Sequence, residues 1–232
     1  MFRNIAQRFG IYWLGVLMVM IGFCGSSPTS VQAGESNVAI SPNFSTLGIG
    51  ADLAVRVTPM LTFRVGGNTF PFSTTGTEGD IEYDIDVTLL SGKFLIDVHP
   101  FSGFFHISAG ALVNGNKADL TALSASTYTI GDVSFPASLV GNLTGTVDFN
   151  GFAPYVGFGW GNPFASSGNW SFRFEGGVVF QGSPNVALAA DGPISSNPLF
   201  LNELEKERQK VEDDIDEYQY YPVLSLSVCY RF

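Results

Sequence analysis

Alternation of apolar and polar side chains is the feature that most restricts how this chain can fold. In the segment 168–190, for example, Phe172 and Phe174 alternate with Arg173 and Glu175. Successive side chains of a β-strand point to opposite faces, so the segment predicts a strand with one apolar and one polar face. The same pattern recurs along most of the 232 residues. Beyond the N-terminal segment no run of about 18 apolar residues occurs, which argues against a bundle of membrane helices.

The alternating segments predict eight strands, and the connections between them alternate in length. The strands are expected at 36–44, 46–58, 61–73, 80–99, 104–117, 142–161, 168–190 and 217–232. Short connections are expected at 57–61, 100–103 and 161–168, and longer ones at 74–80, 118–141 and 191–216. Outer-membrane barrels have short periplasmic turns and longer external loops. The sequence therefore predicts an all-β fold, an eight-stranded antiparallel up-and-down transmembrane β-barrel with both ends on the periplasmic side.

The competing interpretation is a soluble lipocalin-like or sandwich protein. It differs from a membrane barrel in which face of each strand points inward. One face is rich in glycine and carries the charges, and the other carries the large aromatic side chains. An eight-stranded barrel has an interior that side chains just fill, and outward aromatic rings suit a lipid surface. The charges predicted to line the lumen are Asp52, Arg56, Arg64, Lys93, Asp97, Arg173, Glu175 and Arg231.

The segment 80–99 departs from this pattern. Near its start the apolar residues occupy odd-numbered positions such as Ile85, and near its end they occupy even-numbered positions such as Ile96. A β-bulge at Ser91-Gly92 would reconcile the two halves. Alternatively, the first half rises above the lipid, where the direction of each face matters less.

One segment predicts a helix in the last external loop. Asn197 can cap it, and Pro198 fits the first helical position. An apolar stripe at spacings of three and four follows, formed by Leu201, Leu204, Arg208, Val211, Ile215 and Tyr218. We expect an acidic, solvated helix over about 198–217, and a lid or plug over the barrel mouth is the alternative.

The first 33 residues predict a cleaved secretory signal peptide. Arg3 and Arg8 precede an apolar run that ends at Phe23, and the segment closes on the small residue Ala33. The run is shorter than the roughly 20 residues that a membrane-spanning helix needs. Phe23 stands where a lipoprotein signal needs a small residue before Cys24, so lipid attachment is not expected.

The mature part, 34–232, is expected to be one acidic barrel domain. Loss of two leader arginines leaves 11 − 2 = 9 basic against 21 acidic residues, a net charge of −12. No basic stripe is present, which argues against nucleic-acid binding. Cys229 is then the one cysteine, so no internal disulfide forms. With His99 and His106 as the two histidines, no metal cluster and no cofactor are expected.

The chain ends in Tyr230-Arg231-Phe232 behind alternating apolar residues, and this resembles the C-terminal assembly signal of outer-membrane barrels. The segments 46–50 and 97–101 resemble recurring pieces of OmpW-like proteins. The mature region thus resembles the small barrels of the OmpW, OmpA membrane-domain and opacity-like families. The resemblance implies an integral, porin-like protein of a Gram-negative outer membrane. Its implied partners are the bilayer, lipopolysaccharide and the assembly machinery, which would read Tyr230 and Phe232.

Such families do different jobs, so the fold does not define the function. We expect no enzymatic activity and a structural or surface-interaction role, with a narrow channel for ions or small hydrophobic solutes as the alternative; the sequence defines no oligomeric state. A remote alternative is a lipid A deacylase, because His106-Ile107-Ser108 resembles the His-x-Ser motif of that barrel family. Both side chains are predicted to face the lumen near the periplasmic end, far from lipid A, and Asp119 is the next carboxylate along the chain.

Overall fold

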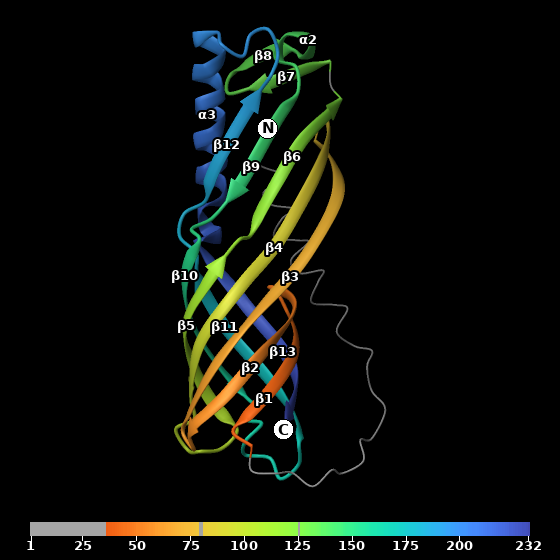
Figure 1. Cartoon of the computed structure of the whole chain (residues 1–232). Helices are drawn as coiled ribbons and strands as arrows, with labels where there is room; N and C mark the ends of the chain where they lie inside the picture. The colour runs from red at the N-terminus through yellow and green to blue at the C-terminus, as the bar shows by residue number, and fades with distance from the viewer. Residues whose placement is uncertain (1–35, 79–80, 125) are drawn as a thin grey trace.

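In the computed structural model, which describes residues 36–78, 81–124 and 126–232, the chain forms a closed antiparallel barrel with a folded cap above it (Figure 1). The predicted signal peptide and Cys24 lie outside the described residues. The eight-stranded barrel predicted from the sequence is confirmed for the described part of the chain. Its strands are β1 (Val38–Ser45), β2 (Gly48–Thr58), β3 (Leu61–Glu78), β4 (Ile81–Val98), β5 (Phe105–Asn114), β10 (Phe152–Trp160), β11 (Trp170–Phe180) and β13 (Tyr220–Arg231).

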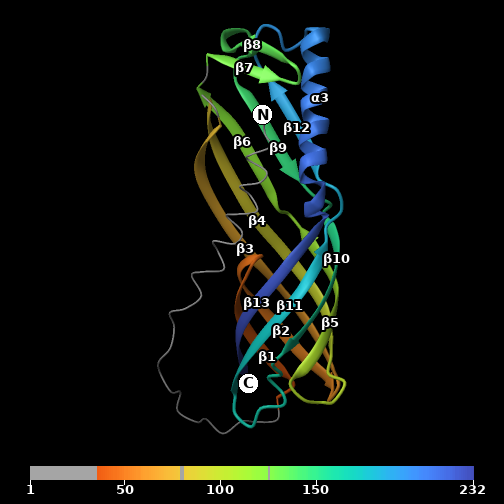
Figure 2. The ribbon, with the colours of Figure 1, turned by 180° about the vertical axis from the view of Figure 1, so that it is seen from behind.

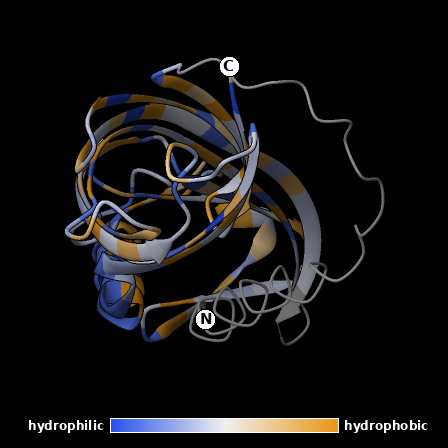
Figure 3. Cartoon of the chain, turned by 90° about the horizontal axis from the view of Figure 1, so that it is seen from below, coloured by the Kyte–Doolittle hydropathy of each residue, from blue (hydrophilic) through white to orange (hydrophobic). Residues whose placement is uncertain are grey.

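Each barrel strand pairs with two antiparallel neighbours, so the sheet closes on itself. The order runs β1, β2, β3, β4, β5, β10, β11 and β13, and β13 returns to β1. Seen from below, the strands form a ring (Figure 3). Closure leaves no unpaired edge on the barrel, and it gives every strand one face toward the lumen and one toward the surroundings.

The cap is built on the upper halves of β3 and β4, which continue past the barrel (Figures 1 and 2). The upper half of β4 leaves β5 and pairs with β6. Strand β6 pairs with β9, and β9 pairs with β12. The other elements that we include in the cap are β6 (Lys117–Ser124), β7 (Thr127–Ile130), β8 (Val133–Pro136), α2 (Ala137–Val140), β9 (Leu143–Asp148), β12 (Asn185–Ala190), α3 (Pro198–Ile215) and the 3-10 helix η2 (Asp216–Gln219).

The cap corrects several of the boundaries predicted from the sequence. The loop predicted at 74–80 is largely strand, because β3 reaches Glu78 and β4 begins at Ile81. The predicted strands 142–161 and 168–190 each divide into one cap strand and one barrel strand. The long connections between the barrel strands therefore form the strands and helices of the cap rather than separate loops.

Strand β4 runs from the cap into the barrel without the predicted bulge at Ser91-Gly92. Its register with β3 is unbroken over the whole strand, and so is its register with β5. Odd-numbered side chains face inward throughout, so that Val87 enters the core of the cap while Lys93 enters the lumen. The bulge explanation is wrong, and the apolar phase changes because the upper half of β4 leaves the barrel.

Helix α3 is confirmed, with Asn197 as its N-cap and Pro198 at its start. The Asn197 side chain accepts a hydrogen bond from the Leu199 amide at 2.9 Å. The predicted stripe is partly wrong, because Leu201 is 47% exposed and Arg208 forms ion pairs with two glutamates of α3. The buried face instead consists of Phe200, Glu203, Leu204, Glu207, Val211 and Ile215.

The helix stands beside the cap sheet, along β12, in both side views (Figures 1 and 2). Its apolar side chains join a core of buried residues from β4, β6, β7 and β12. Phe200 is 1% exposed and meets the ring of Phe135 edge-on at 5.3 Å between centroids. Burial of each such side chain stabilises the cap by about 1.5–3 kcal/mol. Within the described ranges, no helix combines the length and the apolar character needed to cross a membrane.

Candidate functional site

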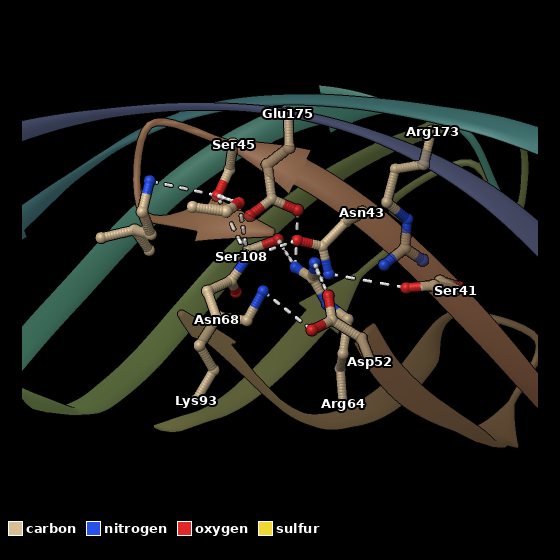
Figure 4. A network of polar contacts seen from close by, with 12 residues as sticks. Ser41, Asn43, Ser45, Asp52, Arg64, Asn68, Lys93, Ser108, Arg173 and Glu175 are labelled. Carbon is tan, nitrogen blue, oxygen red and sulfur yellow. Dashed lines mark hydrogen bonds and ion pairs between the residues drawn. The ribbon is translucent and has the colours of Figure 1, made fainter. Parts of the chain in front are cut away.

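The lumen of the barrel holds a buried network of ion pairs centred on Arg64 of β3 (Figure 4). Arg64 Nη1 lies 3.3 Å from Asp52 Oδ2 on β2. Its Nη2 lies 3.0 Å from Asp97 Oδ1 on β4 and 2.5 Å from Glu175 Oε2 on β11. One guanidinium group therefore connects strands from opposite walls of the barrel.

Two further cations complete the charge balance of this network. Lys93 Nζ lies 2.8 Å from Asp52 Oδ1, and Arg173 Nη1 lies 3.2 Å from Asp97 Oδ2. With Arg64, three cations thus face three carboxylates. Isolated buried ions cost several kcal/mol each, so only close pairing makes such a cluster tolerable.

Side chains of β5 and β10 add further contacts to two of these carboxylates. The Ser108 hydroxyl donates to Asp97 Oδ1 at 2.7 Å, and the Tyr155 hydroxyl donates to Glu175 Oε1 at 2.6 Å. His106 Nε2 lies 3.3 Å from Glu175 Oε2. These contacts connect the network to β5 and β10, so that six of the eight barrel strands contribute side chains to the centre of the lumen.

The lower end of the lumen is closed by Phe164, which belongs to the connection between β10 and β11. Its ring is buried against Ala39 and Ala54, and the guanidinium of Arg56 lies 5.2 Å from its centroid. Arg231 Nη1 reaches the Phe164 carbonyl oxygen at 3.5 Å. Two arginines thus fix the backbone and ring of one residue inside the lower opening.

The upper end of the lumen is filled by apolar side chains. Leu47, at the β1–β2 turn, is 3% exposed and joins Leu95, Leu112 and neighbouring residues in a compact cluster. Tyr221 closes this layer, and its hydroxyl donates to the Thr46 carbonyl oxygen at 2.7 Å. The cavity between this layer and the Arg64 network has a volume of about 10 Å³, which is about the space of one water molecule.

The structure places the eight predicted lumen charges in two groups. Asp52, Arg64, Lys93, Asp97, Arg173 and Glu175 meet in the central network, whereas Arg56 and Arg231 lie at the lower opening near Phe164. Arg56 is partly exposed and its Nε donates to Asn37 Oδ1 at 2.9 Å.

Sequence reasoning missed three residues that close the lumen. These residues are Leu47, Tyr155 and Phe164. Tyr155 carries a signal in the sequence, because it is a bulky polar residue on the small-residue face of its strand. Leu47 falls within the predicted strand 46–58, where alternation would place it on the outward apolar face, but it lies in the β1–β2 turn and points inward. Phe164 lies in a connection, where alternation gives no direction.

His106 and Ser108 do not form a serine–histidine pair. Ser108 donates to Asp97 rather than to His106, and both residues are 0% exposed. Asp119 lies on β6 in the cap, where it pairs with Lys117 at 2.7 Å. Across the described ranges, no group of three or more His, Cys, Asp and Glu side chains is arranged to hold a metal ion.

Tyr230 and Phe232, at the C-terminal end of the chain, lie on the outer surface of the barrel at its lower end. The ring of Tyr230 lies 4.8 Å from that of Trp170 and 5.5 Å from that of Phe232, between centroids. Phe232 itself is 54% exposed. Tyr230 is half-buried beside these rings, and recognition of the two residues by a partner stays a prediction.

In the cap, two carboxylates of α3 bind the turn of the β7–β8 hairpin. The Asp132 amide donates to Glu203 Oε2 at 2.9 Å, and the Gly131 amide donates to Glu207 Oε2 at 3.2 Å. Gly131 has a φ of 62°, and an added Cβ would lie 2.5 Å from Glu203 Oε2. The Asp132 amide, together with Lys206, lowers the pKa of Glu203. Negative charge on the helix thus holds the hairpin in place.

Comparison with known proteins finds similarity in structure. No family model and no curated protein matches the chain. The crystal structure of Acinetobacter baumannii CarO2 is similar with a TM-score of 0.57 and 24% identity, covering 84% of this chain and 98% of that one. That of Acinetobacter baumannii CarO is similar with a TM-score of 0.51 and 21% identity, covering 85% and 98%.

The chain shares the fold of these barrels. At such identities the likeness extends to the architecture, and it agrees with the closed eight-stranded barrel described above. The OmpW, OmpA and opacity-like families are not named by these comparisons, so that part of the sequence resemblance stays a prediction.

Proposed function

We propose that this chain is an integral outer-membrane protein of a Gram-negative bacterium, in which a closed barrel anchors the external cap. Its role is structural or one of surface interaction through the cap. The observation that carries the proposal is the inverted barrel: large apolar side chains cover the outside, and paired charges fill the inside. The two similar crystal structures are of outer-membrane barrel proteins, which supports the same location.

The outward face of the barrel has the chemistry of a lipid-facing surface. Phe172 is 72% exposed and Phe94 is 61% exposed, and comparable residues cover the remaining barrel strands. Monomeric soluble proteins rarely expose contiguous apolar patches larger than a few hundred Å². Closure also pairs the backbone groups of every barrel strand, which a lipid environment requires.

Aromatic pairs mark both edges of this apolar belt. Trp170 and Tyr230 meet at the lower edge, and Phe180 and Tyr220 meet at the upper edge at 5.7 Å between centroids. Strand β11, which joins the two edges, has 11 residues. At about 3.3 Å per residue and a tilt of about 40°, it spans roughly 25 Å of height, the height of the apolar band in outer-membrane barrels.

The filled lumen supports an anchor rather than a channel. A continuous water path would have to pass Phe164, the Arg64 network and the apolar layer around Leu47 in succession. Each of these layers is tightly packed, and the cavity between the upper two holds about 10 Å³. We therefore expect no stable conductance.

Electrophoresis of the membrane fraction tests the location. We expect the protein to need detergent for extraction and to migrate faster before heating than after it, because a closed barrel stays compact in the unheated sample. Solubility of the folded, unheated protein without detergent would refute the proposal.

Planar-bilayer recording tests the closed lumen. We expect no discrete openings from the purified protein. Openings that disappear when Arg173 or Glu175 is neutralised would establish the narrow channel instead.

The proposal assigns no catalytic role to His106 or Ser108. Their complete burial beside Asp97 and Glu175 supports a structural role, and lipopolysaccharide would contact the apolar outer surface and the cap. We expect lipid A from cells that produce the protein to keep all its acyl chains. Loss of a chain that Ser108→Ala abolishes would support the deacylase.

A further inference from the structure

We propose that the cap binds one small, uncharged apolar molecule in a cavity between α3 and the cap sheet. The function proposed above names no ligand for the cap. This inference rests only on observations of the cap. It would therefore stand even if the barrel had a different placement.

The cavity has a volume of about 100 Å³, and its wall is almost wholly apolar. Val87, Leu120 and Leu188 form the sheet side of the wall, from β4, β6 and β12. Val211 and Ile215 form the helix side, one turn apart on α3. Protein interiors leave few voids larger than a water molecule, so an apolar pocket of this size, partly open at its mouth, is a distinct feature.

The polar groups at the edge of the cavity are already engaged. The Gln181 side-chain amide donates to the Tyr218 carbonyl oxygen at 2.9 Å, and its oxygen accepts from Asn114 at 3.4 Å. Lys117 pairs with Asp119 at 2.7 Å. A charged or strongly polar ligand would therefore lose its hydration without gaining a partner. The chemistry of the wall selects an uncharged, apolar molecule.

The size of the cavity limits the ligand further. An apolar cavity of about 150 Å³ in another protein stays dry and takes up benzene or xenon. The present cavity fits a single aromatic ring or a short branched alkyl group. Tyr221 lines its floor and also caps the apolar layer of the lumen, so the cavity is separated from the Arg64 network and ends above the barrel. The geometry is that of a binding site and not of a passage.

Methyl NMR of the full chain in lipid nanodiscs, titrated with toluene, tests the proposal. We expect saturable shifts of the Leu120, Leu188 and Ile215 methyl groups. Toluene also partitions into lipid, so the outward methyl groups of Ile96 and Val156 report that partitioning as shifts that grow linearly. Linear shifts at all five positions would show partitioning alone and would overturn the proposal.

A filling variant and its matched control locate the site. Leu120→Trp fills the cavity and should weaken toluene binding at least tenfold. Leu123→Trp places the same side chain on the outer face of the same strand, where Leu123 is 51% exposed, and should leave binding unchanged. Unchanged binding in Leu120→Trp would refute the site.

Ala118→Leu provides a second, smaller filling from the same wall. It decides the question if the tryptophan variant does not fold, because it adds only three carbon atoms at a buried position. Binding as strong as in the unmodified protein would again refute the proposal. Xenon observed by anomalous diffraction in the same cavity, and lost in Ala118→Leu, would support it independently of lipid.

Discussion

The two halves of β4 have the same backbone and opposite side-chain chemistry. In the barrel half, the inward face carries Lys93 and Asp97 and the outward face carries Phe94. In the cap half, the inward face carries Ile85 and Val87 and the outward face carries polar side chains. The strand is continuous in register across the change. The surroundings of each half, and not the strand geometry, decide which face is apolar.

The two regions are therefore stabilised in different ways. The cap buries apolar side chains under a helix, as a water-soluble domain does. The barrel directs its apolar side chains outward, and its interior is held by ion pairs and hydrogen bonds around Arg64. The same kind of substitution should therefore have different effects on stability in the barrel and in the cap.

Removal of the central cation should have the largest effect. Arg64→Met leaves the carboxylates of Asp52, Asp97 and Glu175 close together in the lumen, and loss of one partner of a buried ion pair costs about 3–5 kcal/mol. Urea unfolding followed by gel migration should show the loss. The matched control, Arg208→Met, removes partly exposed ion pairs from α3 and should change barrel stability little. Equal losses in both variants would contradict the contrast.

Truncation in the core of the cap should act mainly on the cap. Phe200→Ala removes a ring packed on Phe135, and such truncations cost about 3–5 kcal/mol. We expect limited proteolysis to cleave the cap while the barrel keeps its heat-dependent migration. Leu199→Ala changes a residue that is 77% exposed and should have no such effect. Loss of the barrel together with the cap would show that the two regions unfold as one unit.

A charge on an outer face should distinguish lipid from water. Val156→Arg places a charge on the outside of the barrel near the middle of β10, where an Arg in lipid costs about 2–4 kcal/mol. Leu123→Arg makes the same kind of change on the outside of the cap, where surface substitutions stay within about 0.5 kcal/mol. Unfolding from lipid vesicles measures both. A harmless Val156→Arg would show that the apolar belt does not face hydrocarbon.

Acidification should loosen the cap before the barrel, with the smallest effect of the four. The Asp132 amide and Lys206 lower the pKa of Glu203 in the folded protein. Its contribution is therefore present above the ordinary glutamate pKa and is lost as the pH falls through the lowered one. Loss of protection of the Asp132 amide, measured as hydrogen exchange relative to the intrinsic rate below about pH 4, would show this. Glu203→Gln should remove that pH dependence. If the pH dependence persists in this variant, it arises from another group.

Much of the barrel could be predicted from the sequence, because period-two alternation reports directly on which face is apolar. The inward charges were placed by that rule alone. The position of α3 was given by Asn197 and Pro198, whose roles are local. The C-terminal assembly signal stays a prediction.

The rest depends on contacts between residues that are distant in the sequence. Glu203 and Glu207 are buried on α3 because amides of the β7–β8 turn approach them, and no helical period reveals such a partner. Phe164 and Leu47 fill the two ends of the lumen from turns. The predicted strand 80–99 already included the upper half of β4, whereas the extension of β3 to Glu78 was missed because 74–80 was predicted to be a loop.

The unbroken register between β3 and β4 fixes the alignment of the barrel and the cap relative to each other along one strand pair. A slip of one residue would turn every side chain of the displaced strand to its other face. In β4 the slip would turn the side chains of Lys93 and Asp97 to the apolar outer face of the barrel. It would also turn Ile85 and Val87 out of the core of the cap. A register slip would therefore be destabilising in both the barrel and the cap, so mispairing during assembly is disfavoured at both ends of one strand.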